Sequence, residues 1–393
     1  MDVIPEELLI LVFSYLDLTS LSFCEQVCKY WNLILSSESQ NCLFQVIDVF
    51  STHNSIAPPF EWTLRKAVNH KTKELIIGGS NYKRTEVILL IDSCANSLIS
   101  LDLSFFHLKQ SFYQTISNKN SIILEKLTIC DARLRDECLE WILKIGTLKY
   151  LNVNNNTSLV GKPFLTCQKP LEALWFEGCE NLEYENILPY VTAYGDRMDE
   201  FGIDGENYSS YQVCTLLSNV LLIKKFSIGF ANEMQDEMLY YLIKTTWEYL
   251  KIKKGINLTE NGFSEIFSQR LNNLEYLELA ECSAISDKVC ILIGENCPNL
   301  HTLIITWSDF ITDLGIISII NGCESLRNFD LTGQKCITEN AFPIDKPYKI
   351  YFSLLTLYLS QCNKVNDSRL WELSNQYPQI KIKNYYGEFK EGW

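Results

Sequence analysis

The sequence predicts an α/β solenoid. A short all-α unit of three helices is followed by a horseshoe of strand-plus-helix repeats, with a parallel sheet on the concave face and helices on the convex face. Two observations predict this fold. The spacing L-x-x-L-x-L recurs along most of the 393 residues at intervals of 23 to 28, and each copy is followed by an apolar segment with helical spacing. Residues 4–31 lack this period and instead consist of short apolar segments typical of helices.

The repeat is clearest in LEYLELAEC, where Leu274, Leu277 and Leu279 hold the spacing. The last two leucines alternate as in a strand with one buried face, and residues 289–293 follow with helical spacing. One such unit cannot bury its own apolar face, so the copies are expected to stack. Thirteen copies begin at Thr72, Leu98, Leu124, Leu148, Leu171, Met198, Ile223, Trp247, Leu274, Leu300, Leu326, Leu354 and Tyr377.

The residues before the repeats predict helices with more apolar surface than they can bury. Pro5 suits the first turn of a helix, and Glu6 and Glu7 favour its positive end. Residues 8–13 are all apolar. Because a unit of about 40 residues buries too little surface to be stable alone, this surplus face must pack on the first repeat or bind a partner protein.

The helical residues before the repeats contain the segments Ile4-Pro5, Phe13-Ser14-Tyr15-Leu16, Leu18-x-x-Leu21 and Val27-Cys28-Lys29-x-Trp31. With these segments, residues 4–31 resemble an F-box. The repeats resemble the cysteine-containing leucine-rich repeats found in F-box proteins, most closely over residues 274–300. The two resemblances divide the chain into an F-box at 1–45, a connecting helical segment at 46–71, and leucine-rich repeats at 72–393, of which the last copy is a cap.

The resemblance implies a substrate-recognition subunit of an SCF-type cullin-RING ubiquitin ligase. Such a subunit binds the ligase's adaptor through the F-box, and through the adaptor a cullin, while its repeats hold a protein substrate. The alternative is a non-catalytic leucine-rich-repeat scaffold whose F-box serves a complex that does not ubiquitinate. Residues that match the family's adaptor-facing positions are Ile4, Pro5, Leu8, Val12, Leu16, Val27, Cys28 and Trp31.

Substrate is expected on the concave face, where the non-leucine strand positions lie. Tyrosines and a tryptophan at these positions are typical of protein interfaces. An acidic stretch and a basic stretch, the latter including Lys254, suggest a substrate segment of complementary charge; the alternative is a merely solvated face. The candidate substrate-binding residues are Tyr150, Asn152, Trp175, Glu177, Glu200, Asp204, Tyr249, Lys251, Lys253, Tyr276, Glu278, Asp330 and Tyr358.

Composition disfavours several other functions. The net charge of −14 would repel a nucleic-acid backbone, and no apolar stretch approaches the roughly 18–20 residues that span a bilayer. With no secretory signal, the 15 cysteines are not expected to form a disulfide framework, so the cytoplasm or nucleus is the expected location. Cys290, Cys297 and His301 could suggest a metal site, but the repeat period explains the cysteines as small core residues. We expect no cofactor, no metal and no catalytic residue; an enzyme on the concave wall is the weakest alternative.

Overall fold

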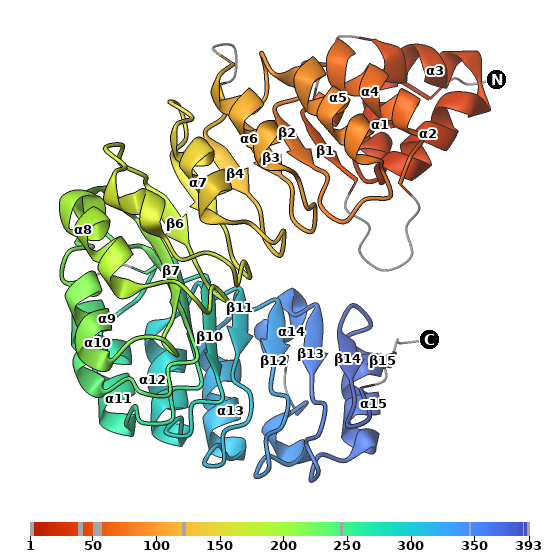
Figure 1. Ribbon diagram of the computed structural model, residues 1–393. Helices are drawn as coiled ribbons and strands as arrows, with labels where there is room; N and C mark the ends of the chain where they lie inside the picture. The colour runs from red at the N-terminus through yellow and green to blue at the C-terminus, as the bar shows by residue number, and fades with distance from the viewer. Residues whose placement is uncertain are drawn as a thin grey trace. The chain divides into compact units, whose positions relative to one another are not determined.

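The computed structural model describes residues 4–37, 42–49, 57–119, 123–243, 247–345 and 347–387, together with the backbone of 389–390. The chain divides into two compact units, Met1–Leu182 and Glu183–Trp393. Each unit is built around a ladder of short parallel strands, with helices between successive strands (Figure 1).

The N-terminal unit begins with three helices and continues with six parallel strands in chain order. The strands are aligned in register, so that Leu75, Leu101 and Leu127 lie side by side in the core. Its elements are α1 (Glu6–Phe13), α2 (Leu18–Val27), α3 (Lys29–Ser36), β1 (Val46–Asp48), α4 (Phe60–Asn69), β2 (Glu74–Ile76), α5 (Arg84–Cys94), β3 (Ser100–Asp102), α6 (Gln110–Ser117), β4 (Lys126–Thr128), α7 (Asp136–Leu143), β5 (Tyr150–Asn152), η2 (Lys162–Leu165) and β6 (Ala173–Trp175).

The C-terminal unit repeats the same strand-plus-helix step, and an antiparallel strand closes its last edge. Its elements are α8 (Tyr184–Tyr194), η3 (Gly195–Arg197), β7 (Glu200–Asp204), α9 (Ser210–Leu217), β8 (Lys225–Gly229), α10 (Asp236–Leu242), β9 (Tyr249–Lys253), α11 (Glu260–Phe267), β10 (Tyr276–Ala280), α12 (Asp287–Asn296), β11 (Thr302–Ile304), α13 (Asp313–Gly322), β12 (Asn328–Asp330), η4 (Glu339–Ala341), α14 (Ile350–Ser353), β13 (Thr356–Tyr358), α15 (Asp367–Gln376), β14 (Lys381–Lys383) and β15 (Phe389–Lys390).

The predicted α/β solenoid is confirmed, and each of the first twelve predicted copies begins two residues before a strand. The last copy was placed wrongly. Tyr377 is the C-cap of α15, as Cys297 is the C-cap of α12, and the final parallel strand begins only at Lys381. The sequences YPQI and CPNL occupy the same place in their repeats, which is the signal that the predicted register missed.

The segment expected to be a helical connection is only partly helical. Residues 60–69 form α4, but residues 46–48 form β1, which pairs in parallel with β2. Phe44, Ile47 and Val49 are buried and hold the repeat spacing without a leucine. The strand ladder therefore starts one repeat earlier than expected.

Acidic residues at helix starts connect one repeat to the next. The Asp287 carboxylate accepts hydrogen bonds from the backbone N–H and the hydroxyl of Thr312, at 2.8 and 2.6 Å. Asp313 binds the N–H and hydroxyl of Thr338 in the same way, each at 2.6 Å. The Thr312 hydroxyl also caps its own helix through the N–H of Leu314. Asp287 and Asp313 each stand in the first turn of a helix and also bind the start of the following helix.

Candidate protein-binding surfaces

Helix α1 has apolar residues on two opposite faces. Leu9 and Phe13 are buried, with 3% and 1% of their surface exposed. Leu8, Leu11, Val12 and Tyr15 follow the spacing i, i+3, i+4, i+7 and are exposed, Leu8 by 53% and Val12 by 54%. Since Leu9 and Phe13 already anchor α1 in the core, the second stripe is surplus apolar surface.

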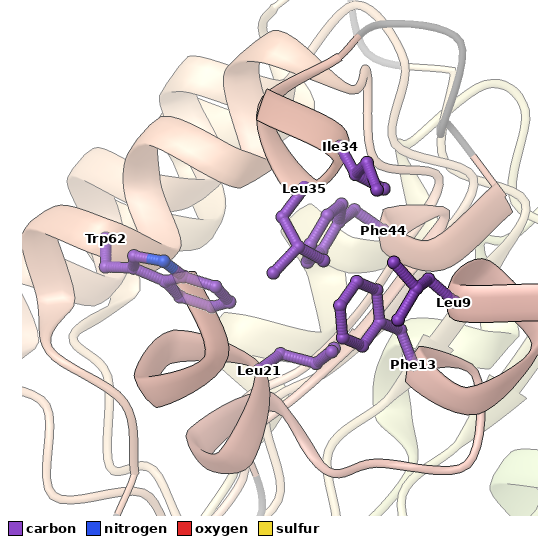
Figure 2. Close-up of a cluster of buried hydrophobic side chains, with 7 residues drawn as sticks. All are labelled: Leu9, Phe13, Leu21, Ile34, Leu35, Phe44 and Trp62. Carbon is purple, nitrogen blue, oxygen red and sulfur yellow. The ribbon is translucent and has the colours of Figure 1, made fainter. Parts of the chain in front are cut away.

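The core beneath α1 draws on residues that follow the three helices. Figure 2 shows Phe44 and Trp62, from beyond α3, packed with Leu9, Phe13, Leu21, Ile34 and Leu35. The rings of Phe44 and Trp62 meet edge to face, 5.9 Å apart. The three-helix unit is therefore completed by the start of the strand ladder and by α4.

A buried ion pair joins the same elements. Lys66 of α4 lies 3.0 Å from the Glu25 carboxylate of α2, and both side chains are almost fully buried. The Trp62 indole N–H and the Ser36 hydroxyl also donate to Glu25, and the more exposed Arg65 lies 2.9 Å from it. Lys66 further donates to the carbonyl oxygen of Leu35. Every oxygen of Glu25 thus has a partner that fixes α2 against α4.

The pKa values of this pair follow from burial and mutual contact. Burial alone would raise the pKa of Glu25, but the hydrogen bond and charge of Lys66, with Ser36 and Trp62, outweigh it and lower that pKa. Burial lowers the pKa of Lys66 against the opposing effect of Glu25.

The predicted adaptor-facing residues fall into two groups. Exposed apolar side chains are those of Ile4, Leu8, Val12, Leu16 and Val27, with exposed fractions of 36–63%. Pro5 and Cys28 are also exposed but have local roles at helix starts.

The local roles concern the N-caps and the core. Pro5 precedes α1 and its carbonyl accepts from Leu8 and Leu9, while the Cys28 thiol accepts the N–H of Trp31 at 3.4 Å. The Trp31 ring is half-buried and meets Phe13 edge to face, with ring centres 5.4 Å apart. Trp31 therefore packs on the core and presents only part of its ring.

Four exposed apolar residues of this region were missed. Leu11 and Tyr15 complete the outer stripe of α1, and Phe23 and Leu33 are 64% and 68% exposed on α2 and α3. The helical spacing from Leu8 would have identified Leu11 and Tyr15. We call the exposed apolar side chains of α1–α3 and of the residues that flank α1 the helical face: Ile4, Leu8, Leu11, Val12, Tyr15, Leu16, Phe23, Val27 and Leu33.

In each strand ladder, the residues that alternate with the buried leucines form the sheet face opposite the leucine core, which we call the open face. In the N-terminal unit, the amine of Lys126 lies over the ring of Tyr150, 4.8 Å from its centre. The Asn152 side chain accepts the N–H of Asn154 at 3.0 Å and so caps the end of its strand. Trp175 is buried, with 7% exposed, and Glu177 is half-buried.

The open face of the C-terminal unit holds an aromatic and ionic cluster. The rings of Tyr249 and Tyr276 stack at 4.3 Å with 12° between their planes. The Tyr276 hydroxyl donates to Glu278 at 2.7 Å, and Lys253 pairs with the same carboxylate at 3.0 Å. Burial, and then the Glu278 carboxylate, raise the pKa of Tyr276, so its hydroxyl keeps its proton.

The charges expected to form an acidic and a basic patch are mostly paired within the chain. Glu200 pairs with Lys225 at 2.7 Å, Lys253 pairs with Glu278, and the Lys254 amine lies over the ring of Phe230. Lys225 was not predicted, although it holds the same strand position as Tyr249.

The remaining candidates of the C-terminal unit also have neighbours in the chain. Asp204 is buried, and Lys251 is half-buried. Asp330 accepts the N–H of Thr332 at 2.9 Å. The amine of Lys383 lies 5.7 Å from the ring centre of Tyr358.

The side chains that could bind a metal ion are the next feature, and the cysteines are the main candidates. Within the described residues, no group of three or more His, Cys, Asp or Glu side chains could hold a metal ion. Cys290, Cys297 and Cys323 are buried in the repeat core, and burial raises the pKa of each thiol, that of Cys323 to about 12. They pack as small apolar residues. No helix in the described ranges is long and apolar enough to cross a membrane.

Comparisons with known proteins agree with this architecture. Residues 1–40 match the F-box-like family model. The DNA repair protein rhp7 of Schizosaccharomyces pombe is 24% identical over 164 residues, which are 41% of this chain and only 28% of rhp7. A crystal structure of the yeast Rad7 and Elc1 complex matches with a TM-score of 0.60 at 15% identity, over 98% of this chain and 93% of that chain, which shows the fold. The chain thus joins an F-box-like domain to a leucine-rich-repeat solenoid, the architecture of F-box/leucine-rich-repeat proteins.

Proposed function

We propose that this chain is the substrate receptor of an SCF-type cullin-RING ubiquitin ligase. The helical face would bind the adaptor subunit and, through it, a cullin, and the open face of the repeats would bind a protein substrate. The observation that carries this proposal is the exposed stripe Leu8, Leu11, Val12 and Tyr15, on α1 and the turn after it, while Leu9 and Phe13 of α1 are already buried in the core. The proposed location is the cytoplasm or the nucleus.

The adaptor is expected to cover apolar side chains that water now surrounds. Burying a leucine or valine side chain contributes roughly 1.5–3 kcal/mol. Burial of a few side chains of the helical face would therefore supply most of the free energy of adaptor binding. The solved complex of Rad7 with Elc1 supports an adaptor of the Elc1 kind as one arm of the test, and the F-box resemblance supports the SCF adaptor as the other.

Co-purification tests the adaptor claim. The full chain would be co-expressed with each adaptor in turn, as wild type, as L8D/V12D, and as the control L221D/L222D, whose leucines are each 65% exposed in the C-terminal unit. We expect a stoichiometric complex with one adaptor for wild type and control, and its loss for L8D/V12D. A complex that survives L8D/V12D unchanged would overturn the proposal.

For the substrate side, the stacked Tyr249 and Tyr276 are the proposed centre of recognition. Tyrosines at a partly buried site contribute large contact area at low entropic cost. The proposed role of the chain is non-catalytic: it would bring substrate close to the ligase's other subunits.

The alternative is an F-box scaffold in a complex that does not ubiquitinate. Reconstitution with adaptor, cullin, RING subunit and ubiquitin-charged conjugating enzyme separates the two. Ubiquitin chains on a bound protein support the receptor, whereas stable binding of that protein without any transfer supports the scaffold.

A further inference from the structure

The helical layer of the N-terminal unit opens between α5 and α6. Helix α4 packs against α5, and α6 packs against α7, whereas α5 and α6 make few direct contacts. A cavity of about 480 Å³ lies between them. Its apolar lining is supplied by Ile88 of α5, Leu108 of the preceding loop, and Phe112 and Ile116 of α6.

This cavity is an open groove rather than an internal void. Phe112 and Ile116 are buried and form part of its lining, while Ile88 is 36% exposed and Leu108 is half-buried. We call it the α5–α6 groove. It lies on the helix side of the repeats and contains no residue of the helical face or the open face, so neither proposed interface accounts for it.

The charged residues that line the α5–α6 groove carry an excess of positive charge. Arg84 and Lys109 line it, and both are exposed at the N-terminal ends of α5 and α6. Neither forms an ion pair with any residue in the described ranges. Asp92, the acidic residue of the lining, is already paired with Lys119. The groove therefore presents uncompensated positive charge in a chain whose net charge is −14.

The position of these cations is unfavourable for the helices themselves. A helix N-terminus carries partial positive charge and is stabilised by acids, so a cation there is unfavourable for the helix. Helix α6 has no acid in its first turn to compensate for Lys109, whereas in α5 the Glu86 carboxylate lies in the first turn beside Arg84. A cation at the start of α6 disfavours that helix, and a residue that works against folding in this way points to a role in binding.

We propose that the α5–α6 groove binds an acidic amphipathic peptide segment of a partner protein. Its apolar side chains would fill the space between Ile88 and Phe112, and carboxylates at one end would meet Arg84 and Lys109. The groove suits a short helix that presents anchors at i, i+3, i+4 and i+7. Charge complementarity selects an acidic over a basic segment.

Fluorescence anisotropy on the full chain tests this assignment. The probe is a labelled amphipathic peptide of about 14 residues with leucines at i, i+3, i+4 and i+7 and two glutamates before the first leucine. Its twin carries lysines in place of the glutamates. We expect the acidic peptide to bind at least about tenfold more tightly than the basic one.

Three variants keep the test falsifiable. R84E/K109E should weaken the acidic peptide at least about tenfold and reverse the preference, and I88D should weaken both peptides. The matched control R133E/R135E changes two exposed cations outside the groove lining and should leave binding unchanged.

Two results would overturn the proposal. One is equal binding of the two peptides, or binding unaffected by R84E/K109E. The other is saturable binding of dodecanoate that R84E/K109E abolishes, while neither peptide binds; this would show a site for a small anionic amphiphile instead.

Discussion

At the scale of single residues, Glu25 and Lys66 decide how firmly the F-box-like helices are held. Both side chains are almost fully buried, and they lie 41 positions apart in the sequence. Replacing Glu25 with Gln leaves the Lys66 ammonium buried without a counter-charge. We expect E25Q to destabilise the N-terminal unit by about 3–5 kcal/mol, measured by urea unfolding. The matched control E140Q removes an exposed pair with Lys144 and should cost less than about 0.5 kcal/mol; equal effects of the two would contradict the assignment.

The same pair predicts a pH dependence. The folded-state pKa of Glu25 is lowered below its ordinary value of 4.5, so its contribution to stability is fully present above that value. The contribution is lost as the pH falls through the lower folded-state pKa. We expect the urea midpoint of the wild type to drop between pH 5 and pH 3, and the drop to be smaller in E25Q. An identical drop in both proteins would remove Glu25 as its source.

Sequence reasoning could not find this pair, because nothing in the local pattern links α2 with α4. It did single out Leu8 and Val12 as matching F-box positions, and both side chains are exposed; their contact with an adaptor stays a prediction. It also expected free charges on the repeats, whereas Glu200 and Lys253 pair across neighbouring strands. Cross-strand partners depend on register, and in the degenerate middle repeats the pattern of residue types alone did not show that Lys225 would lie beside Glu200.

At the scale of elements, α1 carries residues for stability and residues for the proposed adaptor binding on different sides of one helix. Leu9 is 3% exposed and Leu8 is 53% exposed. We expect L9A to cost about 2–5 kcal/mol of stability. L8A should change stability by less than about 0.5 kcal/mol and still weaken adaptor binding. Thermal unfolding and adaptor titration on the two variants check this; a large loss of stability in L8A would show that the outer stripe is part of the core.

Helix α4 is the element that makes the F-box-like helices depend on the repeats. Trp62 lies outside the predicted F-box at 1–45, yet it fills the core of Figure 2. We expect W62A to cost about 3–5 kcal/mol and to weaken adaptor binding without touching the helical face. F23A, an exposed aromatic on α2, is the control for stability. Normal unfolding of W62A would show that the F-box-like helices are self-sufficient.

Strand β1 shows why one element of the ladder was missed. Its repeat uses Phe44, Ile47 and Val49 in place of leucines, so a search for L-x-x-L-x-L passes over it. The physical requirement is only for buried apolar side chains at that spacing. A pattern of apolar positions, rather than of leucines, would have predicted both β1 and the start of the ladder.

At the scale of the whole molecule, the helical face and the open face differ in how many of their side chains already have partners in the chain. The helical face is apolar, and its side chains are exposed in the described part of the chain although residues beneath them are buried in the core. Charged side chains of the open face are largely paired with one another, so a substrate that bound there, as we propose, would have to replace these contacts with new ones. We therefore expect partner binding to depend more on exposed apolar side chains at the helical face than at the open face.

Amide hydrogen exchange on the full chain, with and without a saturating adaptor, tests whether the helical face binds the adaptor. We expect added protection in α1, α2 and α3, with strands β7–β14 unchanged. Protection confined to the repeats, with α1 exchanging as in the free chain, would contradict it.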